Sequence, residues 1–228
     1  LFSLEMASVQ LITRMIASET QISSEKLRKG TLEDDEWNRL FNNVSALENA
    51  PLYIDETPSL SVFDFRAKCR RLVMQHGVKI IMVDYLQLMT ANTGGKGGNR
   101  EQEIATISRS LKAIAKELNV PVIALSQLSR SVETRPNKRP QLSDLRESGA
   151  IEQDADIVSF IFRPEYYKIE HWDNDPEDAQ TRTENQAEII IAKHRNGATA
   201  DVRLSFFKNI AKFADLDVYG DSYGFSNT

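Results

Sequence analysis

A continuous apolar run that ends in an acidic residue constrains the fold of this chain more than any other feature. Residues 78–88 read Val-Lys-Ile-Ile-Met-Val-Asp-Tyr-Leu-Gln-Leu. A run of this kind is typical of a strand that is buried on both faces of a parallel sheet. Such sheets bind their ligands at the carboxyl ends of the strands. The run therefore predicts an α/β fold and places Asp84 at its ligand-binding edge.

Helical and strand patterns alternate along most of the chain. Amphipathic stretches predict helices over residues 7–18, 31–48, 61–77 and 100–118, and apolar runs predict strands over 52–55, 121–126 and 156–162. A capping box from Thr31 to Asp34 is expected to begin the second helix. Strands over 188–193 and 202–207, joined across Asn196-Gly197, are expected to form a hairpin. The order favours a mainly parallel sheet flanked by helices, with an antiparallel C-terminal hairpin extension.

Polar side chains also follow two other predicted strand ends, Glu5 after Ser3-Leu4 and Gln127 after Leu125-Ser126. Asp84 could hold Mg²⁺ and Glu5 could polarise a water, while Gln127 could sense a terminal phosphate. Each residue alone has an ordinary explanation: a turn, a charge in the first turn of a helix, or loop polarity. Together, an acid, an acid and an amide at one edge favour a nucleotide site.

Two further stretches bear on phosphate binding. Lys193 and Arg195 are two residues apart at the end of a predicted strand, so both can point the same way. They suit stabilisation of phosphate charge, including an arginine finger supplied to a neighbouring subunit; the alternative is a solubilising hairpin tip. The glycine-rich stretch Thr93–Gly98 is only superficially similar to a phosphate-binding loop, because Gly97 stands where Ser or Thr should follow Lys96.

Composition excludes several classes of protein. The chain has 228 residues, a formal net charge of −5 and a single cysteine, Cys69. No apolar run approaches the roughly 18 residues that span a bilayer, and one cysteine excludes a disulfide framework and favours the cytoplasm. Residues 91–150 carry ten basic and six acidic side chains, whereas residues 151–190 carry three and eleven. The basic stretch is a candidate for contact with a polyanion, although ordinary solvated surface is the alternative.

Five segments together resemble a known family. They are Phe2–Met6, Val83–Leu88, Leu125–Arg130, Asp144–Asp156 and Ala192–Gly197. In this order and at these separations they are similar to the C-terminal motor domain of the bacterial replicative DNA helicase family, DnaB. The similarity runs from residue 1 to about residue 213, and the block from Arg146 to Asp156 is its most diagnostic part.

The resemblance implies a RecA-like ATPase that forms a homohexameric ring around single-stranded DNA and unwinds duplex DNA at replication forks in the 5′ to 3′ direction. It implies ATP and Mg²⁺ as cofactors, and primase and a helicase loader as partners of the intact protein. Glu5 would activate the attacking water, Asp84 would hold Mg²⁺ through its water shell, and Gln127 would sense the γ-phosphate. Lys193 and Arg195 would reach the ATP of the neighbouring subunit.

The same resemblance places Arg146, Glu147 and Gly149 in the loop that tracks DNA. It also implies a phosphate-binding loop upstream of Leu1, so we expect the chain to be a fragment with negligible ATPase activity of its own. Residues 1–214 are expected to form the motor domain and residues 215–228 a flexible acidic tail. The alternatives are a RecA-like recombinase or other DNA-binding ring ATPase, and a non-catalytic ring module.

Overall fold

The computed structural model describes residues 1–91, 99–172 and 182–216. In chain order its elements are β1 (Phe2–Ser3), α1 (Ser8–Thr20), α2 (Ser24–Lys29), α3 (Asp34–Glu48), α4 (Val62–His76), β2 (Ile81–Asp84), η1 (Leu86–Leu88), α5 (Arg100–Leu118), β3 (Val122–Ala124), η2 (Arg130–Thr134), η3 (Leu142–Ser148), α6 (Gly149–Asp154), β4 (Ile157–Phe162), η4 (Pro164–Tyr167), β5 (Gln186–His194), β6 (Ala200–Phe207) and β7 (Lys212–Asp215). The stretch Thr93–Gly98 and nearly all of the tail expected to be flexible lie outside the described residues.

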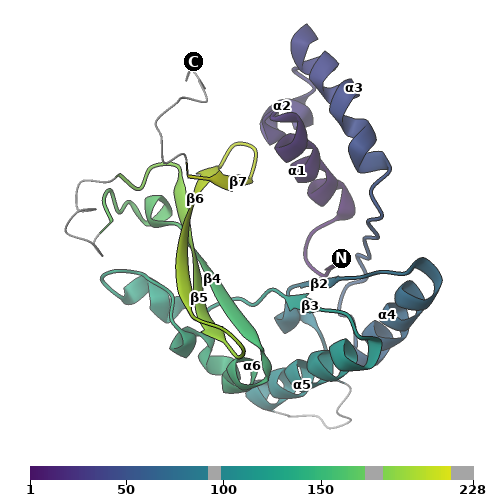
Figure 1. Ribbon diagram of the computed structural model, residues 1–228, viewed down its shortest axis with the longest axis vertical. Coiled ribbons are helices and arrows are strands. Elements are labelled where there is room, and N and C mark those ends of the chain that lie inside the picture. The colour runs from purple at the N-terminus through teal and green to yellow at the C-terminus, as the bar shows by residue number, and fades with distance from the viewer. Residues whose placement is uncertain (92–98, 173–181, 217–228) are drawn as a thin grey trace.

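The described strands form two sheets. One is parallel, with the order β1-β2-β3, and the other is antiparallel, with the order β4-β5-β6-β7. Figure 1 shows the long antiparallel strands standing on one side, with α4 and α5 beneath the short parallel sheet and α1–α3 extending away from it. Helix α6 lies against α5, and the chain enters β4 directly after it. The α/β class and the C-terminal hairpin of β5 and β6 are confirmed.

The core of the parallel sheet is built from its β-branched strand residues and the apolar faces of two helices. Ile81 and Val83 of β2 are buried against residues of α4 and α5, among them Phe65 and Ile107. Phe2 of β1 packs edge-on against Phe65, with ring centroids 4.8 Å apart. This packing fixes β2 between β1 and β3, and with it the position of Asp84.

The expectation that residues 78–88 form a strand buried on both faces is wrong. Strand β2 spans only Ile81–Asp84, and its side chains alternate between buried and exposed positions. Met82 is 39% exposed, because α4 and α5 cover only one face of the sheet among the described residues. The residues after Asp84 turn into η1 and do not continue the strand.

The predicted helices are confirmed, two of them with their boundaries. Helix α5 spans the predicted residues 100–118, and α4 is capped by the Ser61 hydroxyl, which accepts a hydrogen bond from the Asp64 backbone N–H, and ends at Gly77 with a φ of +62°. The capping box from Thr31 to Asp34 is wrong. Helix α3 begins at Asp34, and its capping box joins Glu33 and Glu36, a little further along the sequence.

Three other details differ from expectation. Residues 52–55 form no strand: β1 is only two residues long, and beside it Asp55 forms an isolated bridge to Phe2 while the Leu1 ammonium donates to the Tyr53 carbonyl at 2.8 Å. The predicted strand 156–162 is confirmed as β4, but it pairs antiparallel with β5 and not with the parallel sheet. The short elements α2 and β7 carry no strong periodicity, so the sequence pattern does not predict them. No helix in the described part of the chain is long and apolar enough to cross a membrane.

Candidate functional site

Three of the predicted site residues lie at or just beyond the ends of neighbouring parallel strands, at one edge of the sheet. Ser3 of β1 is in register with Asp84, and the Leu4 backbone N–H donates to the Asp84 carbonyl at 2.7 Å. Glu5 follows directly. On the other side the Leu125 N–H donates to the Val83 carbonyl at 2.9 Å, which brings the chain leading to Gln127 to the same edge. The three positions therefore lie at the strand ends where the sequence pattern puts them.

The two carboxylates at this edge are available for a ligand. Glu5 is exposed and Asp84 is half-buried. Neither side chain has a hydrogen-bonding or ion-pairing partner among the described residues, where no group of three His, Cys, Asp or Glu side chains forms a metal cage either. A lone carboxylate at a strand end suits Mg²⁺, which is usually bound through one or two carboxylates together with phosphates and waters.

Gln87 is a site residue that sequence reasoning missed. Its amide Nε2 donates to the Ser126 hydroxyl at 2.9 Å and to the Gln127 carbonyl at 3.1 Å. Its Oε1 accepts from the Gln127 backbone N–H at 3.2 Å. The side chain therefore clamps the backbone on both sides of the Gln127 Cα. No local pattern marks this role, because the partners are 39 and 40 residues away in sequence.

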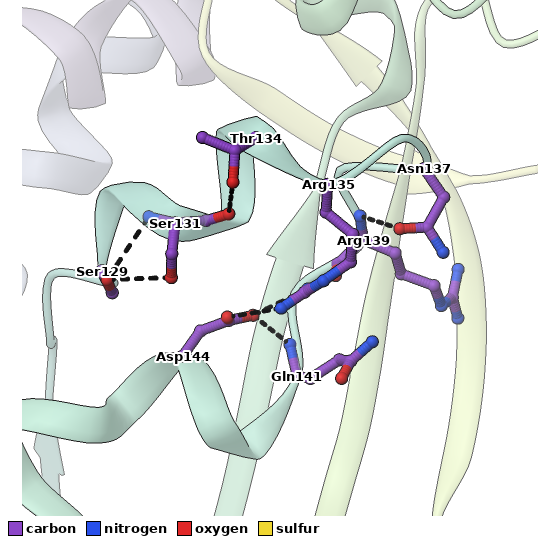
Figure 2. Close-up of polar contacts among 8 residues, drawn as sticks. All are labelled: Ser129, Ser131, Thr134, Arg135, Asn137, Arg139, Gln141 and Asp144. Atoms are coloured by element: carbon purple, nitrogen blue, oxygen red, sulfur yellow. Dashed lines mark hydrogen bonds and ion pairs between the residues drawn. The ribbon is translucent and has the colours of Figure 1, made fainter.

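The segment that follows Gln127 is folded by its own hydrogen bonds (Figure 2). The Ser129 hydroxyl accepts from the Ser131 backbone N–H at 3.3 Å, and the Ser129 N–H donates to the Asp144 carbonyl at 3.0 Å. Arg135 meets the Asp144 carboxylate through both terminal nitrogens, at 2.7 and 3.1 Å. The Gln141 N–H donates to the same carboxylate at 2.7 Å. The stretch between Gln127 and η3 is thus an ordered connection.

A second arginine attaches this segment to the antiparallel sheet. Arg139 forms an ion pair with Glu188 of β5 and another with Asp201 of β6, the latter at 2.7 Å. The side chain of Glu188 is only 4% exposed, so it is a buried charge that needs a partner. The segment after Gln127 is therefore fixed to the strand that carries Lys193.

The ion pair between Arg135 and Asp144 has a testable pH dependence. Hydrogen bonding from Arg135 lowers the pKa of Asp144, further helped by the Gln141 N–H. A lowered pKa means that the stabilisation is complete above the ordinary aspartate pKa of about 3.9 and is lost as the pH falls below it. Asp144→Asn should lower the free energy of unfolding by about 2 kcal/mol at pH 7, and this difference should shrink below pH ~4.

Urea unfolding midpoints at several pH values measure that difference. Glu184→Gln, a change of an exposed carboxylate without a described side-chain partner, is the matched control and should leave the unfolding midpoint unchanged. A difference between wild type and Asp144→Asn that stays constant down to pH ~3 would show that the ionised carboxylate contributes nothing.

The predicted DNA-contacting residues lie where this segment ends. Arg146 and Glu147 belong to η3, and Gly149 begins α6; the side chains of Arg146 and Glu147 lie outside the described part. Gly149 is exposed, with an ordinary helical φ of −48°, and a Cβ built on it would meet nothing within 4 Å. Neither backbone conformation nor packing within the described chain requires glycine there.

Lys193 and Arg195 do point the same way, as their spacing predicted. The Lys193 ammonium donates to the Glu152 carbonyl, and the Arg195 guanidinium donates to the Gln153 carbonyl at 3.0 Å. Both acceptors belong to the last turn of α6, where a helix carries partial negative charge. The Arg195 side chain remains 48% exposed.

The basic stretch from 91 to 150 is less available to a polyanion than its charge suggests. Four of its described basic side chains are held in ion pairs with acidic groups: Arg100, Lys112, Arg135 and Arg139. A pocket of about 410 Å³ opens beside Gln127 and is lined in part by Arg130 and Tyr167. Ion pairs therefore hold four of the eight basic side chains described in this stretch.

Comparison with known proteins assigns the family. Residues 1–215 match the model of the DnaB-like helicase C-terminal domain. The chain is 52% identical over 217 residues to the replicative DNA helicase DnaB of Geobacillus stearothermophilus, covering 95% of this chain and 45% of that protein. It is 49% identical to the replicative DNA helicase DnaC of Bacillus subtilis strain 168, covering 98% and 47%. The chain thus spans less than half the length of these relatives.

Solved structures agree with this match. A solved ATPase domain superposes with a TM-score of 0.83 at 38% identity, covering 95% of this chain and 73% of that one. A DnaB-like replicative helicase, described together with its interactions with primase, superposes with a TM-score of 0.82 at 39% identity, covering 95% and 50%. The sheet edge that carries Glu5, Asp84 and Gln127 therefore lies within a domain of known type. This chain belongs to the family of DnaB-like helicase C-terminal domains.

Proposed function

We propose that this chain is the ATP-driven motor domain of a replicative DNA helicase. The observation that carries the proposal is the sheet edge where Glu5, Asp84 and Gln127 lie at or just beyond the ends of three neighbouring parallel strands. Carboxylates and an amide at such an edge suit the metal-binding and water-positioning parts of nucleoside-triphosphate hydrolysis. Because the chain spans less than half of its relatives, the activity, substrates and partners of the whole protein are part of this proposal.

The two carboxylates have different roles in the proposed reaction. Glu5, exposed and unpaired among the described residues, accepts a proton from the attacking water. Asp84 would hold Mg²⁺, and its position at the end of β2, between β1 and β3, would orient that contact. When bound, Mg²⁺ supplies charge neutralisation at the phosphate oxygens. The proposed cofactors are therefore ATP and Mg²⁺.

Gln127 senses the γ-phosphate and passes its state to the DNA-contacting turn. The clamp by Gln87 fixes the backbone at Gln127, and the ion pair between Arg135 and Asp144 fixes the segment that leads to η3. A movement of the backbone at Gln127 is therefore passed on to η3, because the segment between them is held by these contacts. This ordered connection supports a coupling between hydrolysis and DNA contact.

Arg146, Glu147 and Gly149 contact the backbone of single-stranded DNA. An exposed glycine that the chain itself does not require, at the start of α6, supports close approach of a phosphate to main-chain groups. Contacts of this kind do not need a strongly basic surface. An acidic protein can grip DNA in this way if a ring of subunits joins several modest contacts in one channel.

Lys193 and Arg195 act on the nucleotide of the neighbouring subunit in a homohexameric ring. Their shared direction and the exposure of nearly half of the Arg195 side chain support this role. The ring encloses single-stranded DNA and moves 5′ to 3′, and the intact protein binds primase and a helicase loader. We base the ring around DNA, the direction of movement and the two protein partners on the family to which the chain belongs.

The second candidate is a RecA-like recombinase or another DNA-binding ring ATPase that does not separate strands. Such an ATPase would have the same sheet edge with Glu5, Asp84 and Gln127, so this edge alone does not distinguish it from a helicase motor. A non-catalytic ring module is a weaker candidate, because Glu5 and Asp84 are both present and unpaired among the described residues.

Strand displacement by the intact protein that carries this chain distinguishes the candidates. A forked duplex with one labelled strand, incubated with ATP and Mg²⁺, should release that strand, and an ATP analogue that is not hydrolysed should support no release. Homologous duplex and single strand, mixed under the same conditions, should give no exchanged product. Strand exchange without unwinding would identify a recombinase, and neither activity would identify a non-catalytic module.

A further inference from the structure

Arg195 is held in place by two residues that have no role in the proposed reaction, Gln153 and Asp156. Its guanidinium donates to the Gln153 carbonyl at 3.0 Å and lies 3.4 Å from the Asp156 carboxylate. Its backbone N–H donates to the Asp156 carbonyl at 2.8 Å. Asp156 immediately precedes β4, next to the end of β5, so one residue fixes both the backbone and the side chain of Arg195.

The Asp156 carboxylate is itself held from a third element. Lys112 of α5 hydrogen-bonds to its other oxygen, while Arg195 faces the first. The hydrogen bond from Lys112, followed by the positive charges of Lys112 and Arg195, lowers the pKa of Asp156. The carboxylate is therefore ionised at neutral pH, and it is anchored to the helix that supports the parallel sheet.

The described contacts orient the Arg195 guanidinium without using all of its N–H donors. A guanidinium has five N–H donors in a rigid fork, and the described contacts of Arg195 use Nη1 and Nη2 against Asp156 and α6. The side chain is 48% exposed, and no other hydrogen bond of its guanidinium is found among the described contacts. An arginine on a flexible stem reaches a phosphate more effectively when part of its fork is already fixed.

We propose that Asp156 is the positioning residue of Arg195, and that it therefore acts on the nucleotide bound by the neighbouring subunit and not on its own. This inference rests on the proposed function, in which Arg195 crosses the subunit boundary. It goes further by assigning a role in the neighbouring site to a carboxylate that touches no nucleotide.

Asp156→Asn in the intact protein tests the role. The isosteric amide keeps the size of the side chain but removes the charge that holds the guanidinium, so ATP turnover should fall about 10- to 100-fold while ATP affinity stays unchanged. Glu117→Gln is the matched control. Glu117 also pairs with two cations, Arg66 and Arg70, at the surface between α4 and α5, and its loss should leave turnover unchanged.

Mixed rings separate positioning from a purely structural role. Subunits with Asp156→Asn retain Glu5, and subunits with Glu5→Gln retain Asp156. When the two are mixed, some boundaries join an intact Glu5 to an intact Asp156, so ATPase activity without DNA should exceed that of either variant alone. Mixing Arg195→Ala with Glu5→Gln is the control for the boundary itself and should give the same gain.

The outcomes distinguish the inference from the function on which it rests. A gain in both mixtures supports the role of Asp156. A gain with Arg195→Ala but none with Asp156→Asn means that Asp156 acts within its own subunit, which overturns the inference and leaves the proposed function intact. If ATPase activity rises in neither mixture, Arg195 does not act across the subunit boundary, and the inference fails with that role. Full turnover by Asp156→Asn alone also overturns the inference.

Discussion

Arg195→Ala in the intact protein should leave ATP binding intact and reduce hydrolysis by about 10³-fold or more, the range seen when an arginine finger is removed. The reason is that the guanidinium contributes to the charge developing on the phosphate in the transition state, whereas ground-state binding uses other groups. Fluorescent-nucleotide titration measures binding, and steady-state phosphate release measures hydrolysis.

Arg109→Ala is the matched control for this loss. Arg109 is an exposed arginine of α5 whose guanidinium donates only to the Ala105 carbonyl of its own helix among the described contacts. Its removal takes away the same charge without touching the proposed site, so binding and hydrolysis should both match wild type. If Arg195→Ala hydrolyses ATP as fast as Arg109→Ala, the assignment of Arg195 is wrong.

Glu5→Gln should reduce hydrolysis about 10²- to 10⁴-fold, because the amide cannot accept the proton of the attacking water. The side chain is exposed and has no described partner, so the change should not alter the stability of the domain. Single-turnover hydrolysis of bound ATP isolates the chemical step from product release. Thermal unfolding of the same samples reports on stability.

Glu19→Gln provides the comparison for Glu5. Glu19 is an exposed glutamate of α1 without a described side-chain partner, and its replacement should preserve the rate of the chemical step. A Glu5→Gln protein that retains the wild-type single-turnover rate would refute the role of Glu5 as the base.

The parts of the site that could be predicted from sequence are those set by strand ends. An apolar run fixes where a strand lies, and the carboxyl ends of parallel strands meet at one edge, so Glu5, Asp84 and Gln127 could be placed together. The i, i+2 spacing of Lys193 and Arg195 likewise predicted a shared direction. Their partners on α6 could not be predicted, because no local pattern encodes which helix end packs against a strand.

The remaining errors have the same physical origin. Gln87 contacts residues about 40 positions away, and Arg139 pairs with side chains 49 and 62 positions away; such contacts exist only once the fold has formed. The burial of β2 on one face depends on how many layers surround the sheet, which the apolar run itself does not specify. The sequence therefore predicts elements and edges better than it predicts packing.

The central claim is tested most directly by measuring how the intact protein unwinds forks that differ only in their single-stranded tails. The account predicts ATP-dependent release of the labelled strand from a duplex that offers a 5′ tail for loading, no release from a duplex with only a 3′ tail, and loss of release with Glu5→Gln. Release of the strand by the Glu5→Gln protein, or DNA binding and ATP hydrolysis without any strand release, would contradict the assignment of this chain as a helicase motor.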